Sequence, residues 1–153
     1  MQLPKDLREF IELLNSHDVC YLIVGGYAVA YHGFPRTTGD IDLFIEASLE
    51  NAARLQEVLV QFGFGSLGLT LGDFLEPGTI IQLGYPPHRI DLVTSISGVT
   101  FADAWARRVS ASIDDLPMSL IDRESLLANR AAAGRPKGLL DIDSLSQLNP
   151  GDV

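Results

Sequence analysis

The sequence predicts a single α+β domain, built as a mixed α/β sheet with helices mainly on one face. Three observations predict this fold class. Short apolar runs rich in β-branched and aromatic residues alternate with stretches of helical periodicity. Glycine and proline cluster between these runs, as is typical of turns. The chain has 153 residues, 46% of them hydrophobic, so it is long enough to bury a core.

In the first half, two stretches carry apolar residues at helical spacing. Pro4 suits the first turn of one helix, and Ser48 suits the N-cap of the other. An apolar strand runs up to Val24, and a second strand begins at Asp40. The expected elements are a helix at 4–16, a strand at 18–24, a turn and short helix at 25–33, a strand at 40–46 and a helix at 48–62.

The second half begins with GFGSLG at 63–68, a literal GxGxxG. It follows a helix rather than a strand, so we expect a helix C-cap and a loop instead of a dinucleotide site. Asp122 can cap a helix that Gly134 and Pro136 end. The expected elements are a short helix near 73–75, a hairpin of strands at 78–83 and 88–94, a helix at 101–107, a strand at 109–113, and helices at 123–133 and 139–148. Residues 1–153 thus form one domain, with 122–148 as a C-terminal helical extension.

Composition limits the partners and the compartment. The net charge is −9, which argues against general DNA binding, although a local basic patch would suit a triphosphate. Cys20 is the one cysteine, so no internal disulfide is possible. The sequence shows no signal peptide and no apolar run long enough to span a membrane. We therefore expect a soluble, cytoplasmic protein without membrane partners.

Two features between residues 22 and 45 point to chemistry. Gly25 and Gly26 follow a strand, where glycine allows a sharp turn and a close approach of phosphate to backbone N–H groups. Asp40 and Asp42 lie on the next strand, and side chains two residues apart share one face. Neighbouring carboxylates repel each other, and a divalent cation such as Mg²⁺ relieves that repulsion.

This pattern resembles the signature of the polymerase-β-type nucleotidyltransferase superfamily. More narrowly, it resembles the small bacterial nucleotidyltransferase-like proteins of toxin–antitoxin and abortive-infection systems. That superfamily needs a third carboxylate on a later apolar strand, and Asp91 within Ile90-Asp91-Leu92-Val93 matches it. The resemblance covers most of the chain, including the tail at 134–141. One departure is Gly26, because the superfamily commonly has serine there.

The resemblance implies a metal-dependent nucleotidyltransferase that moves NMP from an NTP to a hydroxyl and releases pyrophosphate. Asp40 and Asp42 would bind the nucleotide-associated metal. Asp91, with one or both of them, would hold the metal that activates the acceptor. These aspartates would be the catalytic and metal-binding residues. The expected cofactor is Mg²⁺ or Mn²⁺, and the expected nucleotide is ATP.

The resemblance also implies a phosphate-binding set. Backbone N–H groups at Gly25 and Gly26 would cradle the phosphates, and Arg36 and Lys137 would add positive charge. The acceptor stays open between a protein, a tRNA end and a small molecule such as an aminoglycoside. A partner protein is plausible for an acidic single domain of this kind.

Two alternatives remain. Gly26 in place of serine motivates a catalytically degenerate protein that binds nucleotide, or that acts as a partner subunit or antitoxin. A plain structural α/β domain is the other alternative. It predicts that Asp40, Asp42 and Asp91 do not converge in space.

Overall fold

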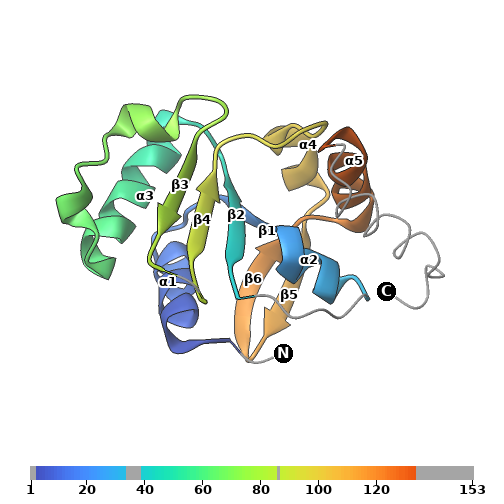
Figure 1. Cartoon of the computed structure of the whole chain (residues 1–153), viewed down its shortest axis with the longest axis horizontal. Coiled ribbons are helices and arrows are strands. Elements are labelled where there is room, and N and C mark those ends of the chain that lie inside the picture. Colours follow the sequence, from blue (N-terminus) through green and yellow to red (C-terminus); the bar gives the residue numbers. More distant parts are fainter. Residues whose placement is uncertain (1–2, 34–38, 86, 134–153) are drawn as a thin grey trace.

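The structure is a computed structural model that describes residues 3–33, 39–85 and 87–133. Within these residues, six strands form one sheet in the order β3-β4-β2-β1-β6-β5, with helices packed around it (Figure 1). The strands are β1 (Tyr21–Val24), β2 (Ile41–Ile45), β3 (Ile80–Leu83), β4 (Ile90–Val93), β5 (Val109–Ile113) and β6 (Leu116–Leu120). The helices are α1 (Lys5–Ser16), α2 (Gly25–Tyr31), α3 (Leu49–Phe62), α4 (Phe101–Ala106) and α5 (Arg123–Ala133), with 3₁₀ turns η1 (Gly65–Leu67) and η2 (Leu71–Phe74).

The sheet is mixed, as the sequence predicts. β2 pairs with β4 in parallel, and β1 pairs with β6 in parallel. The remaining pairs, β1–β2, β3–β4 and β5–β6, are antiparallel. The expected hairpin of β3 and β4 is therefore present, and it brings β4 directly beside β2. This adjacency decides where the aspartates of the two strands meet.

Both faces of the sheet are covered. The larger apolar core lies between one face and helices α1 and α3, with Phe10 and Leu55 fully buried. A second core lies between the other face and helices α2, α4 and α5, and it contains Phe44 and Leu126. The helices are thus divided more evenly than the sequence predicts. The physical reason is that all four residues of β1 are buried, so this strand needs apolar cover on both sides.

Strand β6 was not expected from the sequence. Pro117 lacks an N–H group, so a run that contains it reads as an unfavourable strand. In the structure, Pro117 is in register with Ser112 of the outermost strand β5, whereas the register with β1 is confined to Ile23 and Leu120. The β5–β6 turn is made by Asp114 and Asp115, with φ of 53° and 62°. Positive φ at both central residues matches the right-handed twist of a tight hairpin.

The GxGxxG run behaves as a helix end and a turn, as expected. Ser48 caps α3 by accepting a hydrogen bond from the Asn51 N–H at 3.2 Å. Gly63 ends the same helix in the left-handed conformation, with φ of 100°. The short turn η1 follows, so no helix opens from the glycines toward a strand end. The expected helix at 139–148 lies outside the described residues.

Candidate active site

The first two candidate aspartates lie where β2 begins. Asp40 immediately precedes the strand, and Asp42 is its second residue. Alternation along the strand puts Ile41 and Leu43 into the larger core. Phe44 lies in the second core, so Asp42 shares the face that α2, α4 and α5 cover. The alternation that buries the apolar residues therefore directs both carboxylates to the opposite face.

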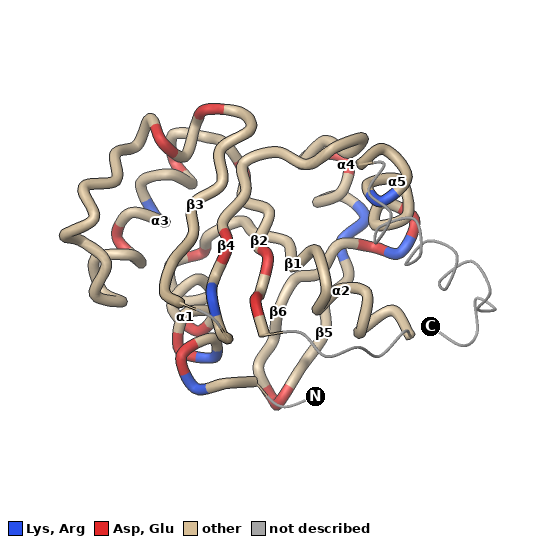
Figure 2. The backbone as a smooth tube through the Cα atoms, viewed as in Figure 1, with Lys and Arg blue, Asp and Glu red and all other residues tan. Residues whose placement is uncertain are grey.

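The third candidate joins them through the strand register. Asp42 of β2 is the direct partner of Asp91 of β4 in a parallel ladder. Neighbouring residues in register project to the same side of a sheet. Figure 2 shows acidic residues side by side on β2 and β4. Asp91 is buried, with 7% of its surface exposed. Convergence of Asp42 and Asp91 argues against the plain structural domain.

Gly25 is packed directly against this pair. It follows Val24, whose register partner on β2 is Asp42. Its φ is 67°, a conformation that other residues adopt only with strain. A Cβ atom at Gly25 would lie 2.1 Å from Oδ2 of Asp42. Only glycine therefore fits beside the carboxylate. Gly26 follows as the second residue of α2 and is half-buried.

Arg89 is the unexpected member of the site. Its Nε donates to Oδ1 of Asp91 at 2.7 Å, and its Nη2 donates to Oδ2 at 3.1 Å. The same Nη2 forms an ion pair with Oδ2 of Asp40 at 3.3 Å. The backbone N–H of Arg89 also donates to Oδ1 of Asp40 at 3.1 Å. One arginine thus links the acidic residues of two strands.

Among the carboxyl groups of the site, Asp42 has a raised pKa. Burial, the negative charge of Asp91 and a hydrogen bond with Asp91 raise the pKa of Asp42 from 3.8 to about 6. The positive charge of Arg130 on α5 acts in the opposite direction on this pKa. The hydrogen bond to Asp91 raises the pKa of Arg89, so its guanidinium stays charged.

Arg89 and Arg130 are site residues that sequence reasoning missed. A signal for Arg89 exists, because it stands two residues before Asp91 and strand alternation puts both on one face. No local signal marks Arg130, because its approach to Asp42 depends on how α5 packs across the sheet. Arg36 and Lys137, the expected phosphate ligands, lie outside the described residues.

The donor set suits a divalent cation in type. Asp42 and Asp91 present hard oxygen donors in register, and Gly25 packs against Oδ2 of Asp42, where a Cβ atom would collide. The described ranges contain no cluster of three His, Cys, Asp or Glu side chains arranged to hold a metal ion. Asp40 and Asp91 are both engaged by Arg89. Asp42 and Asp91 are the residues that could hold such an ion, with Asp40 alongside.

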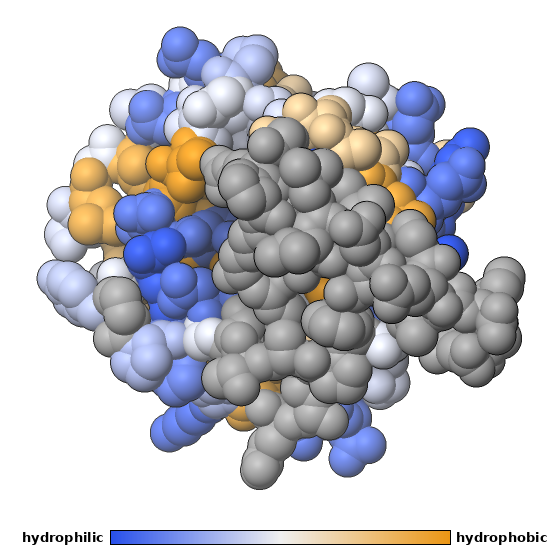
Figure 3. All heavy atoms as spheres, turned by 45° about the vertical axis from the view of Figure 1, so that its right-hand side comes forward, coloured by the Kyte–Doolittle hydropathy of each residue, from blue (hydrophilic) through white to orange (hydrophobic). Residues whose placement is uncertain are grey.

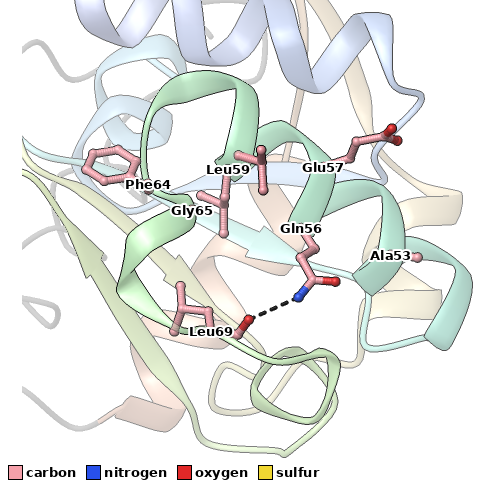
Figure 4. Close-up of a pocket in the computed structure, with 8 residues that line it drawn as sticks. Ala53, Gln56, Glu57, Leu59, Phe64, Gly65 and Leu69 are labelled. Atoms are coloured by element: carbon pink, nitrogen blue, oxygen red, sulfur yellow. Dashed lines mark hydrogen bonds between the residues drawn. The ribbon is translucent and has the colours of Figure 1, made fainter.

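One apolar pocket in the described part of the chain lies elsewhere. A cavity of about 310 Å³ is lined by residues of α3, η1 and the following loop, with Gln56 Nε2 donating to the Leu69 carbonyl at 3.0 Å (Figure 4). Helix α3 packs on the face opposite Asp42. Val60, which lines the cavity, is 60% exposed. On the face drawn in Figure 3, apolar patches border hydrophilic surface. This cavity is separate from the carboxylates.

Across the described part of the chain, no helix combines the length and apolarity that crossing a membrane requires.

No protein-family model matches the sequence, and no curated protein is similar to it in sequence. Solved structures are similar to it in fold. The lincosamide antibiotic adenylyltransferase LnuA, bound to lincomycin, aligns over 96% of this chain and 98% of its own, with 15% identity and a TM-score of 0.55. A Thermotoga maritima protein assigned as a nucleotidyltransferase aligns over 90% and 88%, with 12% identity and a TM-score of 0.61.

The antibiotic-resistance factor ANT(2'')-Ia is also similar to this chain in fold. It aligns over 96% of this chain and 84% of its own, with 14% identity and a TM-score of 0.58. Likeness at this level of identity establishes the fold and leaves the activity to the residues. The chain therefore has a nucleotidyltransferase-like fold, as its sequence pattern predicts.

Proposed function

We propose that this protein is a metal-dependent nucleotidyltransferase, which moves NMP from an NTP to a hydroxyl acceptor. The observation that carries the proposal is the register of Asp42 with Asp91 beside the Gly25 turn. Two carboxylates on adjacent strands, next to a glycine that no other residue can replace without collision, form a site built for oxygen-liganded cations and phosphate. The fold shared with LnuA and ANT(2'')-Ia supports it.

The reaction forms one bond and breaks one. The acceptor oxygen bonds to the α-phosphorus, the bond from that phosphorus to the bridging oxygen breaks, and pyrophosphate leaves while the hydroxyl proton passes to solvent. Bound Mg²⁺ or Mn²⁺ would neutralise the phosphates and lower the pKa of the acceptor hydroxyl.

The chain's own residues orient these groups. Asp42 and Asp91 would hold the cation, with Asp40 beside them, and the turn at Gly25 and Gly26 would let backbone N–H groups approach the phosphates. Arg130 supplies positive charge near Asp42 from α5, since it acts on the pKa of that carboxyl. Arg36 and Lys137 remain proposed phosphate ligands. ATP is the proposed nucleotide.

A radiolabel experiment tests the proposal. The purified full-length protein is incubated with each [α-³²P]NTP and Mg²⁺ or Mn²⁺, in the presence of cell lysate as the source of acceptors. Label is expected on a protein, an RNA or a small molecule, resolved by gel and thin-layer chromatography. Asp42→Asn is expected to lower the rate about a hundredfold or more, because a catalytic cation contributes several kcal/mol.

Asp115→Asn is the matched control. Asp115 is exposed in the β5–β6 turn, and asparagine tolerates its φ of 62°. This variant removes the same charge and is expected to keep full activity. If Asp42→Asn transfers label as fast as Asp115→Asn does, the proposed function is wrong.

Arg89 favours a second candidate, a nucleotide-binding partner subunit or antitoxin that lacks catalysis. Both oxygens of Asp91 accept hydrogen bonds from Arg89, which is an arrangement that satisfies the carboxylate without a metal ion. Gly26 lacks the hydroxyl that serine would offer to phosphate. This candidate predicts NTP binding that does not depend on a divalent cation, with no transfer of label to any acceptor.

A further inference from the structure

Arg89 occupies the oxygens that a cation would need. Its Nε and Nη2 contact both oxygens of Asp91 at 2.7 Å and 3.1 Å, and Nη2 also lies 3.3 Å from Oδ2 of Asp40. Paired contacts of this kind are among the stronger hydrogen bonds in proteins. A divalent cation that takes oxygens from Asp91 would meet a fixed positive charge at the same carboxylate. The two cations therefore compete for the same carboxylate.

The Arg89 guanidinium can move away from the carboxylates while the Arg89 backbone keeps its hydrogen bonds. The Arg89 side chain is 26% exposed, whereas that of Asp91 is 11% exposed, so the arginine has a path to solvent. Oδ1 of Asp40 is held by the backbone N–H of Arg89 at 3.1 Å, and that bond does not depend on the side chain. The backbone of Arg89 also accepts from the Ile41 N–H at 3.0 Å. Departure of the side chain thus leaves the strand ends in place.

We propose that the Arg89 guanidinium is an internal stand-in cation, which holds Asp91 and Asp40 together when no divalent ion is bound and is displaced when one binds. Arg89 is then a positioning residue, because it acts on the carboxylates. This inference rests on the proposed function in one respect, namely that a divalent ion binds at Asp42 and Asp91. Beyond the proposed function, it makes Arg89 a determinant of the affinity for the divalent ion.

The test measures Mn²⁺ binding directly, without nucleotide and without turnover. The full-length protein and the variants Arg89→Met and Arg89→Lys are titrated with Mn²⁺ alone, and free Mn²⁺ is quantified by its electron paramagnetic resonance signal. Arg54→Met is the matched control, because Arg54 forms a 2.6 Å ion pair with Glu50 on the exposed face of α3. Thermal unfolding in EDTA is measured on the same four proteins.

Arg89→Met is expected to bind Mn²⁺ about tenfold more tightly than the wild type, because no charged pair must first be broken. In EDTA it is expected to unfold at a lower temperature, since Asp40 and Asp91 then lose the guanidinium that binds both of them. Arg89→Lys keeps the charge but loses the paired geometry, so it should fall between the two in Mn²⁺ affinity. Arg54→Met should match the wild type in Mn²⁺ binding.

Equal or weaker Mn²⁺ binding by Arg89→Met would overturn the inference. The lysine variant keeps the test decisive if the methionine variant does not fold, because equal or weaker binding by Arg89→Lys overturns it as well. If wild type and variants bind alike and Asp42→Asn abolishes binding, the inference fails while the proposed function stands. If no variant with Asp42 intact binds Mn²⁺, both fail.

Discussion

Protonation of the Asp42 carboxyl is coupled to the stability of the fold. In the unfolded chain its pKa is near 3.8, and in the metal-free fold burial and the charge of Asp91 raise the pKa to about 6. The folded state therefore binds this proton more tightly than the unfolded state does. The contribution of Asp42 to stability is fully present at low pH and is lost as pH rises through about 6, by up to about 3 kcal/mol.

This coupling predicts the effect of Asp42→Asn. In EDTA, the variant should be more stable than the wild type at pH 8 and similar to it near pH 4, because asparagine carries no charge in either state. Urea unfolding at several pH values measures the difference, with Asp115→Asn as the control that keeps the wild-type slope. A pH dependence of the free energy of unfolding that is unchanged in Asp42→Asn would contradict the assigned environment.

Replacement of Gly25 and of Gly63 by alanine distinguishes the cost of backbone strain from the cost of a steric collision. Both have positive φ, 67° and 100°, but a Cβ atom would meet Asp42 at Gly25 and nothing within 4 Å at Gly63. Gly63→Ala should therefore lower the free energy of unfolding by about 1 kcal/mol and leave Mn²⁺ binding unchanged. Gly25→Ala should cost about 3 kcal/mol and abolish Mn²⁺ binding, because Asp42 must move. Equal costs in urea unfolding would refute the packing described for Gly25.

At the scale of elements, Asn51 fixes helix α3 to two strands. Its Oδ1 accepts from the Cys20 N–H at 2.7 Å, and its Nδ2 donates to the carbonyls of Cys20 and Glu46 at 3.1 Å and 2.9 Å. These bonds join the chain just before β1 to the chain just after β2. Asn51 is buried, with 2% of its surface exposed, so its loss removes this partner from the Cys20 N–H and the Glu46 carbonyl. The Cys20 carbonyl still accepts from the Glu46 N–H at 3.2 Å.

The replacement Asn51→Ala is expected to lower the free energy of unfolding by about 3 kcal/mol, as the Cys20 N–H and the Glu46 carbonyl lose this partner. Asn51→Asp should cost at least as much, because a carboxylate oxygen would then face two carbonyls. Asn129→Ala, which removes one exposed bond to the Ser97 carbonyl, should cost about 1 kcal/mol or less. Urea unfolding of the three variants checks this order, and equal values for Asn51→Ala and Asn129→Ala would contradict it.

The elements also show what the sequence can and cannot predict. Period-3.6 patterns predict α1 and α3, and short apolar or alternating runs predict strands β1 to β5, because local burial sets both the pattern and the element. Strand β6 is missed, since Pro117 argues against a strand and its pairing with β5 and β1 makes it favourable. The pairing of Asp42 with Asp91 is expected from the family pattern. The contacts of Arg89 and Arg130 depend on tertiary packing.

At the scale of the whole molecule, the two faces of the sheet differ in what they contribute to stability and to the site. The face under α1 and α3 carries the larger core, and the face under α2, α4 and α5 carries the carboxylates above a smaller core. Loss of packing on either face should lower stability, but only the second face supports the site.

A matched pair of leucines tests this division. Leu55 of α3 and Leu126 of α5 are both fully buried, one in each core. Replacement of either by alanine should lower the free energy of unfolding by about 3 kcal/mol. Leu126→Ala should also weaken nucleotide binding, because α5 carries Arg130, whereas Leu55→Ala should not. Isothermal titration with ATP and Mn²⁺ at a temperature where both variants are folded measures this, and equal affinities would contradict the division.

The central claim is that this fold transfers a nucleotidyl group, and a paired labelling experiment tests it most directly. The same reaction is run with [α-³²P]ATP and with [γ-³²P]ATP, in Mg²⁺ or Mn²⁺ and with the acceptor source identified by the first assay. The α label is expected on the acceptor and the γ label in pyrophosphate. Label from the γ position on the acceptor, or no transfer of α label while ATP and Mn²⁺ are bound, would contradict the proposed function.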